Sequence, residues 1–335
     1  MTELNESTDP IDMKLLDRWQ RDFPLVPRPY LKIGKLLDLS ESEVLDRFGV
    51  LVENKSISRI GAVFKPNTIG ASTLAALSVP DAHLEAVAEV VNDEPGVNHN
   101  YEREHLFNLW FVVTGADRAA ITATLERIKE MSGCPLIEAP LDTAFHLDLG
   151  FGLEGRRRKP AAKAAAEQAT EFTLEPEDRQ LISRLENGLP FSGRPYLDIG
   201  AEIGLSEARI IGRIAYLVEC GVISRFGVIV RHRTLGYRSN AMAVWDVNDD
   251  LVPTIGTVLA QHPAVTLCYS RLRDMPHWPY NLFCMVHARE RSEALAVISE
   301  LNKSHGLSTV PSAVLFSRRC FKQRGAKYSA DQRAA

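Results

Sequence analysis

Apolar residues recur at helical spacing at the beginning of each half of the chain. The spacing predicts helices over residues 12–22, 30–37, 41–54, 177–187, 196–203 and 207–220. Ser40 and Glu43 fit a capping box at the third helix, while Ser206 and Gly221 suit the start and the stop of its counterpart. Alternating patterns then predict strands over residues 58–64 and 224–230. Each half therefore begins as a helix-turn-helix followed by a wing strand.

A second pattern follows Gly70 and Gly236, in the order strand, helix, strand, strand, helix, strand. In the first half the elements are expected at 71–79, 82–93, 97–103, 106–114, 117–131 and 136–147. In the second half they are expected at 239–247, 251–261, 264–271, 281–288, 290–304 and 308–317. This order is that of a ferredoxin-like αβ sandwich, an antiparallel sheet with two helices on one face. Its other face must be covered, commonly by a second copy of the same sheet.

The two halves also share short strings of residues at a constant offset of 166 positions. The first pair is Arg28-Pro29-Tyr30 and Arg194-Pro195-Tyr196. The second pair is Ile57-Ser58-Arg59-Ile60-Gly61 and Ile223-Ser224-Arg225-Phe226-Gly227. A repeat this long that occurs only twice indicates two complete domains, which could pack as a pseudo-dimer. The expected fold class is therefore α+β, a tandem duplication in which each half is a winged helix-turn-helix plus a ferredoxin-like αβ sandwich, with the two sheets packed together.

These patterns set the expected domain boundaries. Winged-helix domains are expected at 1–66 and 173–232, and αβ sandwiches at 67–152 and 233–320. Residues 153–172, which contain a basic run and an alanine-rich stretch, read as a linker, and 321–335 as a C-terminal tail.

Composition narrows the class of protein. With 45% hydrophobic and 24% charged residues, the 335-residue chain can form cores in several domains. No apolar run is long enough to cross a bilayer and the first residues do not resemble a signal peptide, so we expect a cytoplasmic protein without a membrane partner. The five cysteines lack the spacing of a disulfide framework or a zinc site. A formal net charge of −4 argues against general binding to polyanions.

The strand at 97–103 carries the most reactive set of side chains. Because side chains alternate along a strand, His99, Tyr101 and Arg103 project from one face. The return strand adds Asn108 and Trp110. An imidazole, a phenol and a guanidinium therefore project together.

The second half repeats the tyrosine, arginine and asparagine but not the histidine. Tyr269, Arg271 and Asn281 match the first half, Leu267 stands where His99 would be, and Arg273 lies just beyond. The turn between the two strands is five residues longer than in the first half and contains His277, Trp278 and Tyr280. Such an aromatic, proline-bounded loop suits a wall or lid over a flat ligand. We therefore expect one competent pocket, near the junction of the halves.

Two strings carry a resemblance to a known family. His99-Asn100-Tyr101-x-Arg103 and Trp278-Pro279-Tyr280-Asn281-Leu282-Phe283 are similar to the two subunit types of siroheme decarboxylase, and the chain as a whole resembles the fused form of heme d1 biosynthesis. The resemblance implies loss of CO2 from the ring C and D acetates of siroheme, giving 12,18-didecarboxysiroheme. Siroheme would be the substrate and bring its own iron, with no further cofactor and no protein metal site. The fused chain could also form a homodimer.

The resemblance and the chemistry together suggest roles for single residues. His99, Tyr101 and His277 are the catalytic candidates. Substrate carboxylates and the flat ring would be held by Arg103, Asn108, Trp110, Tyr269, Arg271, Arg273, Trp278, Tyr280, Asn281 and Arg231. His146 and His287 fit either structural imidazoles or axial ligands of the iron.

A transcriptional regulator is the main alternative, because a winged helix followed by an αβ sandwich also resembles the Lrp/AsnC family. In such a regulator the third helix enters the major groove and its basic side chains neutralise phosphates. Here that helix carries Glu41, Glu43, Asp46 and Glu53. Because these carboxylates would repel phosphates, the sequence disfavours DNA as a partner.

Overall fold

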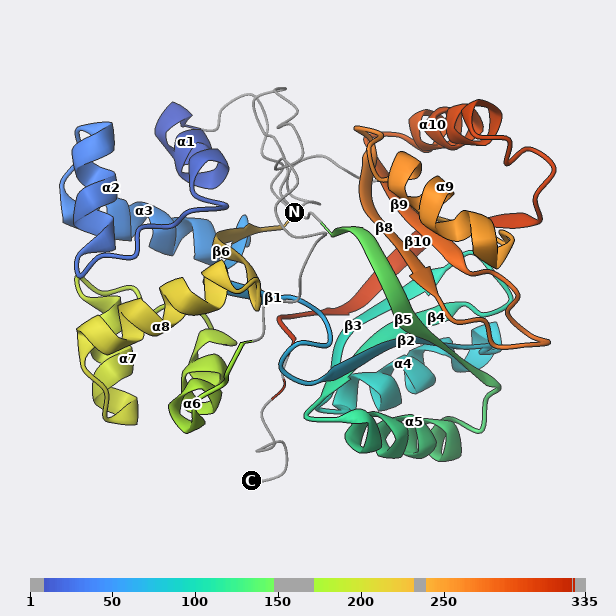
Figure 1. The fold of residues 1–335 in the computed structure, drawn as a ribbon, viewed down its shortest axis with the longest axis horizontal. Helices are drawn as coiled ribbons and strands as arrows, with labels where there is room; N and C mark the ends of the chain where they lie inside the picture. The colour runs from blue at the N-terminus through green and yellow to red at the C-terminus, as the bar shows by residue number, and fades with distance from the viewer. Residues whose placement is uncertain (1–8, 148–171, 232–238, 327, 329–335) are drawn as a thin grey trace. The chain divides into compact units, whose positions relative to one another are not determined.

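The computed structural model describes residues 9–147, 172–231, 239–326 and 328. The chain divides into two compact units, each built from both halves of the sequence (Figure 1). The first unit comprises Met1–Ile69 with Gly150–Gly236, and the second comprises Gly70–Leu149 with Tyr237–Ala335. The linker expected at 153–172 falls almost entirely outside the described residues.

The first unit contains the two helix-turn-helix segments. Their helices are α1 (Pro10–Arg18), α2 (Pro29–Leu37), α3 (Glu41–Glu53), α6 (Pro176–Leu185), α7 (Pro195–Ile203) and α8 (Glu207–Glu219). The capping box expected at α3 is present, since the Ser40 side chain accepts from the Glu43 backbone N–H and the Glu43 carboxylate accepts from the Ser40 N–H. All six helices lie where the apolar spacing predicts them.

The two expected wing strands pair with each other, and not in a hairpin within each half. The strands β1 (Ile57–Phe64) and β6 (Ile223–Val230) pair with each other, antiparallel, in a two-stranded sheet centred on Gly61 opposite Gly227. At Gly227 a Cβ atom would lie 2.3 Å from the Trp19 carbonyl oxygen, so glycine is required for this close approach. The ladder joins the two helix-turn-helix segments into one unit.

The second unit contains the two αβ sandwiches. The first sandwich consists of β2 (Ala71–Leu77), η1 (Asp81–His83), α4 (Leu84–Asp93), β3 (Val97–Arg103), β4 (Leu109–Gly115), α5 (Arg118–Ser132) and β5 (Leu136–Leu147). The second consists of β7 (Ser239–Trp245), η3 (Asp249–Leu251), α9 (Val252–Leu259), β8 (Val265–Arg271), β9 (Leu282–Ala288), α10 (Arg291–Ser304) and β10 (Ser312–Gln323). The strand β10 continues beyond the expected domain end at residue 320.

The two sheets join at their edges into a closed barrel, in the order β10-β3-β4-β2-β5-β8-β9-β7. The two long strands make the closure, because β5 pairs with β2 and then with β8, and β10 pairs with β7 and then with β3. The sequence predicted two separate sheets packed in a pseudo-two-fold pair. The structure shows instead that each half completes the hydrogen bonding of the other, which leaves the barrel without an open edge.

The barrel separates three apolar cores. Two of them lie between the strands and the helices outside, one in each half. The third lies inside the barrel and takes residues from both halves, including Leu74, Trp110, Tyr269, Trp278, Phe283 and Leu315. No helix among the described residues is long and apolar enough to cross a membrane.

Candidate active site

The strand β3 turns its reactive side chains into the barrel. Asn100 points outward, where its side-chain amide donates to the carbonyl of Ala88 and to the side chain of Asn92 on α4. Tyr101 is the neighbour of Trp110, which belongs to the interior core. Since side chains alternate, Tyr101 and Arg103 share one face of the strand, as the sequence predicts, and the structure shows that this face is the interior of the barrel.

His99, Tyr101 and Arg103 form a row along this inner face. The His99 and Tyr101 rings are stacked with centroids 6.3 Å apart, and the Arg103 guanidinium carbon lies 5.8 Å from the Tyr101 ring centroid. His99 Nδ1 is 2.7 Å from the Asn98 side-chain oxygen. The amide oxygen can only accept, so a proton on Nδ1 makes this bond and fixes the orientation of the ring.

Arg271 is the most unusual cation in the barrel. Its guanidinium carbon lies 4.5 Å from the Tyr269 ring centroid and 5.8 Å from that of Phe283, and its Nη1 donates to the Ala139 carbonyl at 2.7 Å. Its buried Nε has no hydrogen-bond partner among the described residues. Desolvation lowers the pKa of Arg271 below the ordinary arginine value. A cation in such surroundings is suited to an anion that supplies the missing partner.

The histidine of this arrangement occurs in one half only. Leu267 belongs to the interior core at the position that corresponds to His99. In the ladders, Leu267 is opposite Leu147, whereas His99 is opposite Gln323. The two halves are therefore related in backbone at this position but differ in side-chain chemistry.

No local pattern in the sequence indicates that β10 borders the histidine. In the ladder, Gln323 is opposite His99, Cys320 is opposite Tyr101, and Ser317 is opposite Arg103. Directly opposed residues of an antiparallel pair share a face. The wall beside the first-half histidine thus comes from the second half, more than two hundred positions away in the sequence.

The structure gives the two asparagines a structural role. The Asn108 side chain exchanges two hydrogen bonds with the backbone of Val79, at 2.8 and 2.9 Å. The Asn281 side chain makes the same pair of bonds with the backbone of Val247, both at 2.9 Å. The duplicated asparagines therefore fix the turn after the first strand of each sandwich, and their predicted contact with substrate is not supported by this geometry.

Arg273 and His277 also differ from their predicted roles. Arg273 forms ion pairs with Asp246 at 2.8 Å and with Asp249 at 2.6 Å, and it donates to the carbonyls of Val247 and Pro279. These bonds occupy the guanidinium in holding the long turn. His277 is exposed to solvent, away from the interior core.

Trp278 is inside the barrel and is not a lid. Its side chain is fully buried, with ring centroids 4.8 Å from Trp110 and 4.9 Å from Tyr280. The Trp278 indole N–H has no hydrogen-bond partner among the described residues, whereas that of Trp110 donates to the Phe107 carbonyl. The aromatic loop thus inserts a tryptophan into the interior core, contrary to the expectation of an open stacking surface.

Arg231 and a surface depression beside α4 complete the description of the predicted residues. Arg231 belongs to the first unit, where its backbone N–H donates to the Ser56 carbonyl. A surface depression next to α4 is lined by residues that include Asn108 and His105. Burial lowers the pKa of His105, whose ring meets Trp278 edge to face at 5.3 Å.

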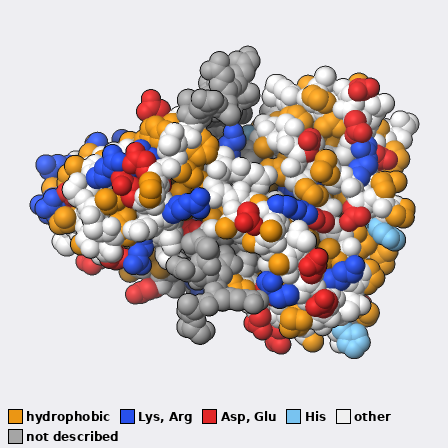
Figure 2. All heavy atoms as spheres, turned by 60° about the horizontal axis from the view of Figure 1, so that its bottom comes forward, with side chains coloured by type: hydrophobic (Ala, Val, Ile, Leu, Met, Phe, Trp, Pro, Cys, Tyr) orange, Lys and Arg blue, Asp and Glu red, His pale blue; other side chains and the backbone are white. Residues whose placement is uncertain are grey.

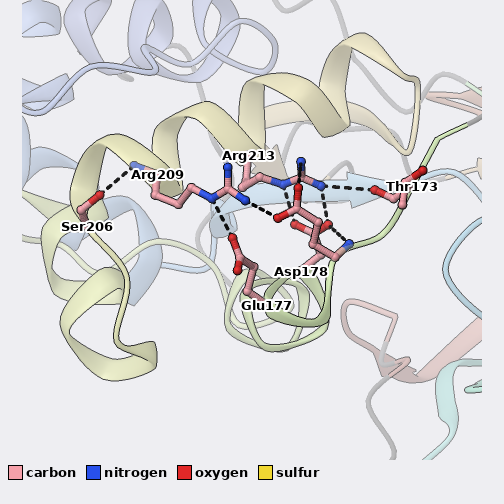
Figure 3. A network of polar contacts seen from close by, with 7 residues as sticks. Thr173, Glu177, Asp178, Ser206, Arg209 and Arg213 are labelled. Atoms are coloured by element: carbon pink, nitrogen blue, oxygen red, sulfur yellow. Dashed lines mark hydrogen bonds and ion pairs between the residues drawn. The ribbon is translucent and has the colours of Figure 1, made fainter.

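The basic side chains of the helix α8 are held by acidic residues of the same unit (Figure 3). Arg213 forms an ion pair with the fully buried Asp178, and its Nη1 donates to Glu175 at 3.1 Å. Arg209 forms ion pairs with Glu175 and Glu177. These two arginines are the basic residues of the helix that would have to meet a DNA backbone.

The first half repeats this network. Arg47 on α3 is paired with Asp12 at 2.7 Å and with Asp9 at 3.0 Å, at the positions equivalent to Arg213, Asp178 and Glu175. On the face drawn in Figure 2, basic and acidic side chains are intermixed. Both segments have the helix-turn-helix arrangement, but the arginines of α3 and α8 are already neutralised by neighbouring carboxylates.

Fold and site together define a class, a fused pair of helix-turn-helix and AsnC-type segments with an asymmetric barrel interior. The family described as AsnC-like ligand binding domain matches residues 69–141 and 234–322, and the family described as siroheme decarboxylase NirDL-like HTH domain matches residues 12–57 and 178–223. The chain belongs to the siroheme decarboxylase family.

Individual relatives agree over nearly the whole chain. The siroheme decarboxylase NirDL subunit of Paracoccus denitrificans is 46% identical over 318 residues, which cover 95% of this chain and 97% of the relative. A crystal structure of the siroheme decarboxylase NirDL matches with a TM-score of 0.71 and 27% identity, covering 96% of this chain and 95% of that one. A second crystal structure, in complex with an iron-uroporphyrin III analogue, matches with a TM-score of 0.69 and 27% identity, covering 96% and 94%.

Proposed function

We propose that this protein is a siroheme decarboxylase that removes CO2 from the ring C and D acetates of siroheme, giving 12,18-didecarboxysiroheme for heme d1 biosynthesis. The family and the near full-length relatives support the reaction. The observation that carries the site is Arg271, a desolvated cation in the interior of the barrel whose Nε has no hydrogen-bond partner within residues 9–147, 172–231, 239–326 and 328. A substrate carboxylate would supply the partner that the protein does not.

The reaction makes modest chemical demands on the protein. In each step the bond between the acetate methylene and the carboxylate breaks, CO2 leaves, and the electron pair passes to the methylene carbon. The conjugated macrocycle delocalises that charge, and one proton then converts the methylene into a methyl group. The chain must therefore orient the acetate, exclude water and deliver a proton, so the proposal requires no cofactor beyond the iron that the substrate brings.

His99 is the proposed proton donor. Its imidazole lies beside Tyr101 on the inner face of β3, and the bond from Nδ1 to the Asn98 side-chain oxygen orients the ring for delivery of a proton to the methylene carbon. A positioned general acid contributes about 10²–10⁴ in rate. Tyr101, which stacks on His99, is proposed to fix the orientation of the imidazole.

The arginines are proposed to bind the carboxylates that remain on the product. An arginine that held the departing carboxylate would stabilise the bound substrate as well as the transition state, and would not accelerate the step. Arg103 and Arg271 therefore anchor the rim of the macrocycle, with Tyr269 and Trp110 as apolar neighbours. Arg273 and His277 are left out, since the first is held by Asp246 and Asp249 and the second is exposed.

The reaction makes the protein a carbon-carbon lyase. A cytoplasmic location forms part of the proposal, because all five cysteines are unpaired thiols, as expected in a reducing compartment. A DNA partner is not proposed, because the arginines of α3 and α8 are paired with carboxylates.

Anaerobic incubation of the purified protein with siroheme, followed by mass spectrometry, tests the function. We expect the mass to fall by two CO2 units, with one intermediate that has lost one unit. Unchanged siroheme, together with salt-sensitive binding of the protein to a defined DNA site, would instead support an Lrp/AsnC-type regulator.

A further inference from the structure

A chain of polar side chains crosses the interior face of the second half and ends on Arg103. Arg103 Nη1 lies 3.4 Å from the Asn240 side-chain oxygen, and the Asn240 side-chain nitrogen lies 3.0 Å from His287 Nε2. His287 Nδ1 lies 2.8 Å from the Thr266 hydroxyl, which lies 3.1 Å from the Met285 carbonyl. The four side chains come from β3, β7, β9 and β8, and Arg103, Asn240 and His287 are each more than nine-tenths buried.

The hydrogen bonds of this chain can run in one direction only. The guanidinium can only donate, so Asn240 must present its oxygen to Arg103 and its NH2 group to His287. His287 Nε2 must then accept, which places the proton of the neutral ring on Nδ1. This proton is donated to the Thr266 oxygen, and the Thr266 hydroxyl donates to the Met285 carbonyl.

A fixed direction couples the state of His287 to the position of Arg103. If Nε2 carried a proton, two hydrogen-bond donors, this N–H and the NH2 group of Asn240, would face each other at 3.0 Å. Rotating the amide would relieve that conflict but would turn the NH2 group onto the guanidinium. Arg103 would then keep its bond to the Leu315 carbonyl, at 3.1 Å, and lose the one to Asn240. The neutral His287 with its proton on Nδ1 is the state that holds Arg103 in both bonds.

We infer that His287 is a positioning residue, which acts through Asn240 to fix the Arg103 guanidinium for a carboxylate of the substrate. The inference rests on the proposed function for the identity of that substrate, but not for the geometry of the chain. The equivalent of His287 in the first half is Thr114, which donates to the Gly96 carbonyl, so the arrangement has no counterpart there. It adds a further asymmetry between the halves.

Binding and steady-state measurements with siroheme test the coupling. His287→Leu should raise the Kd and the KM for siroheme about tenfold, the scale of one hydrogen bond to a charged group, with a much smaller change in kcat. Thr266→Val, which has nearly the same shape, should act in the same direction, and His287→Gln should restore most of the affinity because its side chain can accept from Asn240. The control is His262→Leu, a histidine of the same half outside the chain, which should leave the Kd unchanged.

A double-mutant cycle separates positioning from a general effect on the fold. In an Arg103→Ala background, His287→Leu should have no further effect on the Kd, because the group it positions is gone. An equal loss in both backgrounds, or no loss in the parent, would overturn the inference. If the protein binds siroheme without decarboxylating it, the Kd still measures the coupling while the proposed reaction fails.

Nitrogen NMR provides a readout that is independent of activity. With 15N-histidine labelling, the signals lost in His287→Gln should be those of a neutral ring protonated at Nδ1. A ring protonated at Nε2 would overturn the inference, whatever the substrate of the protein.

Discussion

Trp110 and Trp278 come from opposite halves of the chain and meet inside the barrel, with ring centroids 4.8 Å apart and ring planes at 63°. Both side chains are almost fully buried. The longer turn of the second half therefore contributes to the core that unites the two sandwiches. Trp278 therefore contributes mainly to the stability of the barrel. Only its indole N–H, which has no hydrogen-bond partner among the described residues, is left to contact a substrate.

We expect Trp278→Ala to destabilise the barrel by about 3–5 kcal/mol, the usual cost of removing a large aromatic side chain from a core. The free energy of unfolding, measured with urea, checks this prediction. Met275→Ala in the same turn is the control, because Met275 is exposed and should change stability little. A Trp278→Ala protein with parental stability and lost siroheme binding would restore the lid function that the sequence predicted.

We expect Arg271→Ala to weaken siroheme binding by one to two decades, because it removes a desolvated cation from an anionic substrate; about 1.5–3 kcal/mol per charged hydrogen bond sets this scale. The Kd from absorption titration is the measurement. Arg273→Ala is the matched control, since Arg273 is already paired with Asp246 and Asp249. An equal loss of binding in both variants would mean that the two arginines share the substrate.

We expect His99→Ala to slow decarboxylation by about two to four decades in kcat while the Kd for siroheme changes little. Single-turnover mass spectrometry under anaerobic conditions measures the loss of CO2 from bound siroheme separately from siroheme binding. The matched substitution in the second half, Leu267→Ala, should leave kcat within a few-fold of the parent. Parental turnover by His99→Ala would show that another group or a bound water delivers the proton.

We expect Asp178→Ala to lower the free energy of unfolding of the first unit by about 3–5 kcal/mol, because it leaves Arg213 without its buried partner. Asp12→Ala, at the equivalent position of the first half, should cost about 0–1 kcal/mol because Arg47 is more exposed. Urea unfolding followed by circular dichroism compares the two. Equal losses would mean that burial does not distinguish the duplicated networks.

The protonation of His105 should make the barrel less stable in acid. Burial lowers the pKa of His105 below its ordinary value of 6.5, and its Nδ1 accepts from the Phe107 N–H. Between the folded and the unfolded pKa the unfolded chain binds more protons, so stability falls as the pH is lowered through about 6.5. The slope of Tm against pH between 7 and 5 should be smaller in His105→Gln. An unchanged slope would assign the acid sensitivity to other groups.

Much of the fold could be read from local patterns. The capping box at Ser40 predicted the start of a helix, and the alternation at 97–103 predicted the side chains that share one face of β3. The repeated strings predicted the duplication. Each of these features depends on residues close together in the chain. The missing histidine at Leu267 likewise predicted the asymmetry of the interior. Such features follow from backbone periodicity and need no knowledge of distant partners.

Tertiary structure decided the rest, because it depends on which distant residues meet. The exchange of β5 and β10 between the halves, the insertion of Trp278 into the core and the pairing of Arg273 with Asp246 have no local signature. A duplicated asparagine looks the same in sequence whether it binds substrate or the Val79 backbone. By itself the sequence determined the elements, their repetition and the chemical groups present. Only the folded barrel decided which of those groups are already satisfied by the protein, and which, like the Arg271 Nε, find no partner in the described part of the chain.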